Sequence, residues 1–130
     1  MSIRVLVVDD SAVVRQVITA LLSQDPQVSV AAAADPIIAM EKMKRARPDV
    51  IILDLQMPRM DGLELCRRIR AAPKVASTPV ILVTSLDKPE EKLEGLEAGA
   101  DAYISKASFD QETLLGTIRQ LIGKAVSTVS

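Results

Sequence analysis

Short runs of apolar residues, mostly Val, Ile, Leu and Ala, recur along the chain, each followed by a turn or a helical pattern. They contain few polar residues, as expected for strands that are buried on both faces of a parallel sheet. The third run leads directly into Asp54. The second run, residues 28–33, is rich in alanine and is a weaker strand prediction. The predicted strands cover residues 3–8, 28–33, 50–54, 80–83 and 102–105.

The segments between these runs show the spacing of apolar residues that indicates amphipathic helices. In the first segment the apolar face consists of Val14, Val17, Ile18, Leu21 and Leu22. Ser11 and the pair Asp35-Pro36 are typical of helix N-termini. Ser108 with Gln111 matches a capping box, and Gly99 is expected to end the preceding helix.

Strands and helices therefore alternate along the whole chain, with short connections. This alternation indicates parallel strands joined by right-handed crossovers, with helices on both faces. We expect an α/β fold with a single doubly wound, five-stranded parallel sheet in the strand order 2-1-3-4-5. The last helix is expected to end at Gly123, so that residues 1–123 form one domain and residues 124–130 a polar tail or the start of a linker.

Composition excludes several classes of function. The 130 residues include no histidine and a single cysteine, Cys66, which excludes Ser-His-Asp and Cys-His catalysis and an internal disulfide. The formal net charge is −1, so bulk electrostatics favour no direct binding of nucleic acid. No apolar run has the pattern of a signal peptide or the length of a membrane span, and we expect a cytoplasmic protein without membrane contact.

Polar side chains stand at the C-terminal ends of four predicted strands. They are Asp9, Asp10, Asp54, Thr84 and Lys106. In the order 2-1-3-4-5 these four strands are neighbours, so their ends meet at the edge where open α/β sheets bind ligands. Each residue alone is more often a turn, cap or solvated residue. Helix capping does not explain why such residues follow all four neighbouring strands.

Carboxylates held together repel one another, and a hard divalent cation compensates this repulsion best. We therefore expect a Mg²⁺ site that remains open to solvent. Such a site suits a phosphoryl group, whose transfer needs positioning and charge neutralisation more than acid–base chemistry. In this interpretation Asp54 is the nucleophile that forms an aspartyl phosphate, while Lys106 and the Thr84 hydroxyl bind phosphoryl oxygens.

In order and spacing, five segments resemble the receiver domains of two-component response regulators. They are residues 5–11, 48–54, 57–62, 79–85 and 99–106. The resemblance extends from residue 3 to about residue 122 and implies a (βα)5 flavodoxin-like fold and a role in phosphorelay signal transduction. Residues 35–39 and 57–63 are similar to receivers of the chemotaxis methylesterase, and residues 105–111 to receivers of hybrid chemotaxis kinases.

The resemblance also implies how the acidic residues act. Asp54 would accept phosphate from the phosphohistidine of a sensor histidine kinase or a histidine phosphotransfer protein. Asp10, Asp54 and the backbone carbonyl of Gln56 would bind Mg²⁺ directly. Asp9 would act mostly through a water molecule.

Lys106 and Thr84, by the same resemblance, would hold the phosphoryl group, and movement of Thr84 toward it would let Tyr103 turn inward. This would alter the face formed by the fourth helix, fifth strand and fifth helix, which a downstream protein recognises. Alternatively, Tyr103 is a fixed packing residue at a strand end. Ala107 stands where the family usually has proline, often after a cis bond. A cis bond before a non-proline residue costs about 3 kcal/mol, so we expect a trans bond.

A switch of this kind catalyses only its own phosphorylation and dephosphorylation, but two other classes share parts of the pattern. An aspartyl-phosphate phosphatase of the haloacid dehalogenase class needs a second acid where this chain has Gln56. A flavin-binding protein needs a phosphate-binding loop after the first strand, where Asp9 and Asp10 would repel the phosphate. The chain is either a stand-alone receiver or one excised from a larger protein, such as a chemotaxis methylesterase.

Overall fold

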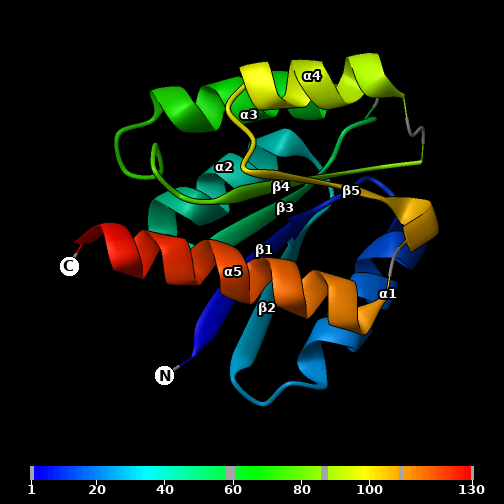
Figure 1. The fold of residues 1–130 in the computed structure, drawn as a ribbon, viewed down its shortest axis with the longest axis vertical. Helices are drawn as coiled ribbons and strands as arrows, with labels where there is room; N and C mark the ends of the chain where they lie inside the picture. Colours follow the sequence, from blue (N-terminus) through cyan, green and yellow to red (C-terminus); the bar gives the residue numbers. More distant parts are fainter. Residues whose placement is uncertain (1, 58–60, 86–87, 109, 130) are drawn as a thin grey trace.

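The computed structural model describes residues 2–57, 61–85, 88–108 and 110–129; residues 58–60 of the segment 57–62 lie outside them. Its centre is a five-stranded parallel sheet in the predicted order β2-β1-β3-β4-β5 (Figure 1). The strands are β1 (Ile3–Val8), β2 (Val28–Ala33), β3 (Val50–Asp54), β4 (Val80–Thr84) and β5 (Ala102–Ser105). The helices are α1 (Ala12–Ser23), α2 (Pro36–Arg45), α3 (Gly62–Ala71), α4 (Pro89–Glu97), the 3₁₀ helix η1 (Lys106–Ser108) and α5 (Gln111–Val129).

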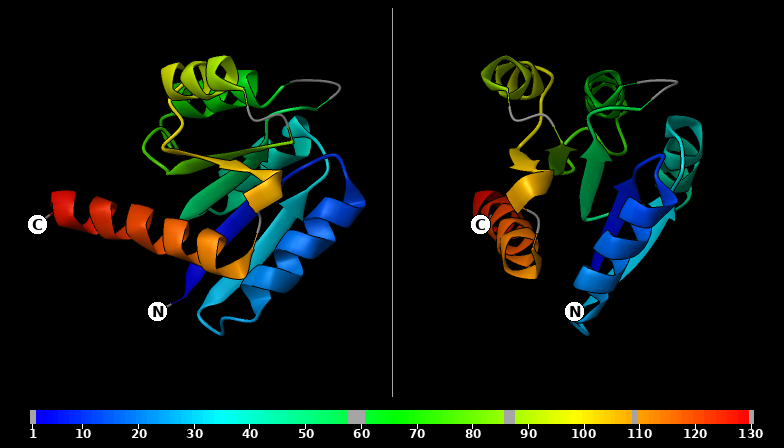
Figure 2. Two further views of the ribbon diagram at one scale, coloured as in Figure 1. Left: turned by 45° about the vertical axis from the view of Figure 1, so that its right-hand side comes forward. Right: turned by 90° about the vertical axis from the view of Figure 1, so that its right-hand side faces the viewer.

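Alternate residues of the central strands face opposite layers of helices. In β3, Val50 and Ile52 belong to the cluster that includes α1 and α5, whereas Ile51 and Leu53 belong to the cluster that includes α2 and α3. Figure 2 shows α1 and α5 on one side of the sheet and α2, α3 and α4 on the other. Every residue of β3 and β4 is buried, which is why both strands are unbroken apolar runs up to their last residue.

Three of the predicted helix ends are confirmed. The Ser11 hydroxyl and the Asp35 carboxylate each accept a backbone N–H of the helix that they begin. Gly99 follows α4 with a φ of 103°, the left-handed conformation in which glycine ends helices. Of the helices described above, none has both the length and the apolar character that crossing a bilayer requires.

Two expectations for the last helix are wrong. The capping residue is Asp110 and not Ser108. The Oδ1 atom of Asp110 accepts the Thr113 N–H at 2.7 Å. Ser108 belongs to η1, and α5 begins only at Gln111. The helix also continues through Gly123 to Val129. Glycine inside a helix lowers helix stability by only about 1 kcal/mol relative to alanine, a penalty small enough for the helix to continue through it. The division into residues 1–123 and 124–130 stays a prediction.

Arg70 of α3 ties the N-terminal ends of β4 and β5 to the helix layer. Its guanidinium ion-pairs with Asp101 at 2.7 Å, and the same Asp101 oxygen accepts the Val80 N–H at 2.9 Å. It also donates to three backbone carbonyls, those of Ala76, Thr78 and Gly99. One side chain therefore satisfies the backbone of the two loops that lead into these strands.

Arg70→Met is expected to lower the free energy of unfolding by about 1.5 kcal/mol, because it leaves several acceptors without their charged donor. Urea unfolding followed by circular dichroism measures the change. Arg67→Met is the matched control. Arg67 lies on the same helix, and its one ion pair among the described residues is an exposed pair with Glu64; such pairs contribute little. Equal stability of the two variants would contradict the role of Arg70.

Candidate functional site

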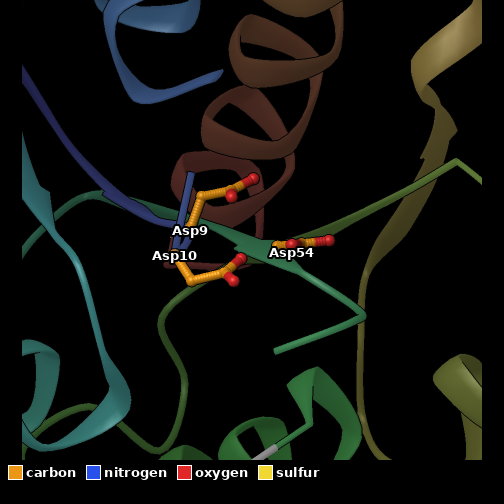
Figure 3. Close-up of side chains that lie close together, drawn as sticks. All are labelled: Asp9, Asp10 and Asp54. Atoms are coloured by element: carbon orange, nitrogen blue, oxygen red, sulfur yellow. The ribbon is translucent and has the colours of Figure 1, made fainter. Parts of the chain in front are cut away.

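Three aspartates meet at the C-terminal ends of two neighbouring strands (Figure 3). Asp9 and Asp10 follow β1, and Asp54 is the last residue of β3. The two strands pair in parallel with Val8 opposite Leu53, so both bring their acids to the same edge of the sheet. One carboxylate oxygen from each aspartate lies within 4.8 Å of those of the other two.

Two of these carboxylates are buried. Asp9 is 2% exposed and Asp54 is 5% exposed, whereas Asp10 is exposed. The pKa of Asp54 is raised to about 6, mainly because burial disfavours its ionised form. The charges of Asp9 and Asp10 act in the same direction, and the Gln56 N–H and the Lys106 ammonium oppose them. Ionisation of the whole cluster therefore costs free energy unless a cation compensates it.

Lys106 provides part of this compensation. It begins η1, directly after β5, and its Nζ lies 3.6 Å from Asp9 Oδ2 and 3.6 Å from Asp54 Oδ1. The ammonium group is thus shared between two carboxylates that come from different strands. When the three aspartates are ionised, one ammonium leaves an excess of negative charge in the site.

Backbone and side-chain donors hold the aspartates in place. Asp9 Oδ1 accepts the Ser11 N–H at 2.8 Å, and Asp54 Oδ1 accepts the Gln56 N–H at 3.2 Å. Arg15 Nη1 donates to the backbone carbonyl of Asp9 at 2.7 Å. The role of Arg15 cannot be predicted from the sequence, because no spacing rule connects a helical arginine with a carbonyl of the preceding turn.

The other predicted site residues lie around this cluster. Thr84 ends β4, is fully buried and pairs in register with Ser105, the residue before Lys106. The Gln56 side chain accepts a hydrogen bond from Ser85 Oγ at 3.2 Å. Tyr103 is half-buried and packs against the core cluster between the sheet and α2–α4. The structure thus gathers the three aspartates in one cluster, with Lys106 in ion-pair range of Asp9 and Asp54 and Thr84 at the same sheet edge.

The peptide bonds of the described residues are all trans. This includes the bond between Lys106 and Ala107, as expected for alanine in place of proline.

The donor set fits Mg²⁺. The available side-chain atoms are carboxylate oxygens, which are the ligands that Mg²⁺ prefers. They carry more negative charge than Lys106 neutralises, and the exposed Asp10 leaves the cluster accessible from solvent. A small, hard divalent cation would offset both the burial and the carboxylate repulsion that raise the pKa of Asp54.

Sheet order, acidic cluster and lysine together define a class of protein. The sequence profile of the response regulator receiver domain matches residues 5–119. The chain therefore belongs to the receiver domains of response regulators, as the resemblance indicated.

Among curated proteins, several with similar sequences are protein-glutamate methylesterases/protein-glutamine glutaminases. The chain is 44% identical over 126 residues to protein-glutamate methylesterase/protein-glutamine glutaminase 1 of Xanthomonas campestris, covering 94% of this chain and 34% of that protein. It is 48% identical over 118 residues to the protein of the same name in Chromobacterium violaceum, covering 88% of this chain and 32% of that protein. The chain thus spans about a third of the length of these relatives.

Solved structures of whole receiver domains match nearly end to end. Chemotaxis protein CheY4 of Vibrio cholerae has a TM-score of 0.86 and 39% identity, covering 93% of this chain and 99% of that one. The response regulator domain of Thermotoga maritima CheB has a TM-score of 0.83 and 36% identity, covering 95% and 98%. The receiver domain of a Pseudomonas aeruginosa sensor histidine kinase, solved with magnesium coordinated in its active site cleft, has a TM-score of 0.84 and 30% identity, covering 95% and 99%.

Proposed function

We propose that this receiver domain is a phosphorylation-dependent switch in which Asp54 accepts the phosphoryl group. The supporting observation is the cluster itself: a buried aspartate lies beside two further carboxylates and 3.6 Å from the Lys106 ammonium. The phosphoryl donor is the phosphohistidine of a sensor histidine kinase or of a histidine phosphotransfer protein.

The residues of the chain supply the nucleophile and part of the positive charge. With a pKa of about 6, Asp54 is mostly ionised at neutral pH and available as a nucleophile. One of its oxygens attacks phosphorus, the P–N bond breaks, and the electron pair of that bond stays on the imidazole nitrogen, which takes up a proton. Lys106 and the Thr84 hydroxyl bind the oxygens of the transferred group.

The metal-binding residues in this proposal are Asp9, Asp10, Asp54 and Gln56, the last through its backbone carbonyl. Mg²⁺ at this position would supply the remaining positive charge that the phosphoryl oxygens need. The burial of Asp9 and Asp54 keeps competing water away from two of these carboxylates and so strengthens their electrostatic interactions.

The output of the switch is a change in the face formed by α4, β5 and α5, which a downstream protein recognises. Thr84 and Tyr103 couple this face to the site. Leu93 and Leu96 of α4 are 59% and 50% exposed, and such exposed apolar side chains support a contact with a protein partner. The domain comprises residues 1–123 and works in the cytoplasm, with no catalysis beyond its own phosphorylation and dephosphorylation.

A second candidate is that the chain is the receiver of a longer chemotaxis methylesterase. The chain matches about a third of the length of two methylesterases, which supports a place within a longer protein of this kind. The receiver would then control an enzymatic domain. The haloacid dehalogenase alternative is disfavoured because Gln56 stands where that class needs an acid.

The test is intact-mass spectrometry after incubation with Mg²⁺ and acetyl phosphate. The wild type is expected to gain one phosphoryl group, and Asp54→Asn none. Asp61→Asn is the matched control, because Asp61 lies in the same β3–α3 connection but caps α3, a role that asparagine also fills. It should be phosphorylated like the wild type.

Equal phosphorylation of Asp54→Asn would show that another residue is the acceptor. A wild type that is modified neither by acetyl phosphate nor by a phosphohistidine donor would contradict the switch itself.

A further inference from the structure

Arg15 lies half-buried on α1, next to the acidic cluster. Its Nη1 donates to the carbonyl oxygen of Asp9 at 2.7 Å, which is a short, charge-assisted hydrogen bond. Within the described part of the chain, no ion pair joins Arg15 to a carboxylate. The guanidinium therefore holds the backbone beside the acids rather than an acid itself.

The carbonyl that Arg15 holds belongs to the peptide that joins Asp9 to Asp10. Because a peptide unit is planar, the direction of this carbonyl also sets the direction in which the Asp10 backbone continues. Asp9 itself is held by two other hydrogen bonds. Its N–H donates to the Ala33 carbonyl, and its carboxylate accepts the Ser11 N–H. None of the described hydrogen bonds holds the exposed Asp10 carboxylate, so its position depends on the turn.

We propose that Arg15 is a positioning residue that fixes the Asp9–Asp10 peptide and so directs the Asp10 carboxylate into the divalent-cation site. Figure 3 shows the Asp10 carboxylate pointing toward Asp54, the orientation that this peptide sets. The inference rests on the proposed function, because it takes the three aspartates as the cation site.

The sign of the effect separates positioning from simple electrostatics. Arg15 carries a positive charge, which repels a bound cation. If Arg15 acted through its charge alone, its removal would strengthen cation binding. If it acts by holding the peptide, its removal weakens cation binding, and loss of a residue that supports metal ligands typically weakens affinity at least about tenfold.

The experiment is isothermal titration calorimetry of the whole chain with Mg²⁺, without any phosphoryl donor. Arg15→Met, which keeps an unbranched helix-forming side chain, is expected to raise the Kd for Mg²⁺ about tenfold. Arg15→Lys keeps the charge and one donor group and should give an intermediate Kd. Gln16→Met, an exposed neighbour on α1, is the matched control and should bind like the wild type. Urea unfolding in EDTA measures the stability of each variant separately.

Unchanged or tighter Mg²⁺ binding by Arg15→Met overturns the inference and leaves the proposed function in place. If Arg15→Met does not fold, Arg15→Lys decides, and a Kd at or below that of the wild type overturns the inference. A wild type that binds no Mg²⁺ removes the cation site and the inference with it.

Discussion

In the absence of divalent cations, Asp54→Asn is expected to raise the free energy of unfolding at neutral pH by about 2 kcal/mol. Loss of a buried hydrogen-bonded carboxylate normally destabilises a protein, but this carboxylate is ionised at a cost. Its pKa is raised from 3.8 to about 6 by burial and by the charges of Asp9 and Asp10. A rise of about two pKa units corresponds to about 3 kcal/mol, a cost that the neutral amide does not incur. The weaker interaction of the amide with Lys106 and the Gln56 N–H offsets about 1 kcal/mol of this gain.

The pH dependence follows from the direction of this shift. A carboxyl whose pKa is raised by folding stabilises the folded state below its unfolded pKa, and this contribution is lost as the pH rises through the folded pKa. The stability difference between Asp54→Asn and the wild type should therefore be small below pH 3.8 and grow up to about pH 6. Urea unfolding in EDTA across this range measures it.

Addition of Mg²⁺ should reduce the difference in free energy of unfolding between Asp54→Asn and the wild type. A cation that binds only the folded state stabilises the protein by mass action, and the variant lacks one of the carboxylates that would bind the cation. Asp35→Asn is the matched control, since Asp35 is a half-buried cap of α2, away from the three aspartates of the site, and asparagine caps helices equally well. A variant that is less stable than the wild type at neutral pH without cations would show that burial and the neighbouring carboxylates do not make ionised Asp54 costly.

Gly62→Ala is expected to lower the free energy of unfolding by about 3 kcal/mol, at the upper end of the range for overpacking. Gly62 begins α3 at the point where the helix meets β3, and its N–H donates to the Leu55 carbonyl at 2.9 Å. A Cβ atom at this position would lie 2.5 Å from the Asp54 carbonyl oxygen and 2.8 Å from the Leu55 Cα. These are backbone atoms, so either the helix or the end of the strand must move.

Gly116→Ala is the matched control for this substitution. A Cβ atom at Gly116 meets no atom within 4 Å, and alanine has a helix propensity about 1 kcal/mol more favourable than glycine. The control should therefore be more stable than the wild type. Because the strained segment carries Asp54, Gly62→Ala should also lose Mg²⁺ binding, which titration calorimetry measures. Wild-type stability of Gly62→Ala would show that α3 can withdraw from β3 without cost.

The sheet and its order could be predicted because buried parallel strands leave unbroken apolar runs, and β3 and β4 are buried throughout. The topology then places the C-terminal ends of β1, β3, β4 and β5 at one edge. The sequence alone therefore predicts that Asp9, Asp54 and Lys106 lie close together.

Other features depend on interactions that a linear pattern does not contain. The choice of Asp110 over Ser108 as the cap depends on where η1 ends, and both residue types cap helices well. The continuation of α5 past Gly123 reflects a small intrinsic penalty that the helix overcomes. The contact of Arg15 with the Asp9 carbonyl depends on a side-chain conformation, which periodicity does not determine.

Lys106 directly follows β5, the last strand along the chain, although it lies against acids at the ends of β1 and β3. A ribosome synthesises β1 and β3 well before β5, so a growing chain carries the aspartates before it carries the ammonium that partly neutralises them. A chain that ends before β5 therefore lacks the ammonium that lies 3.6 Å from both Asp9 and Asp54, and the negative charge of its aspartates is not partly neutralised in this way.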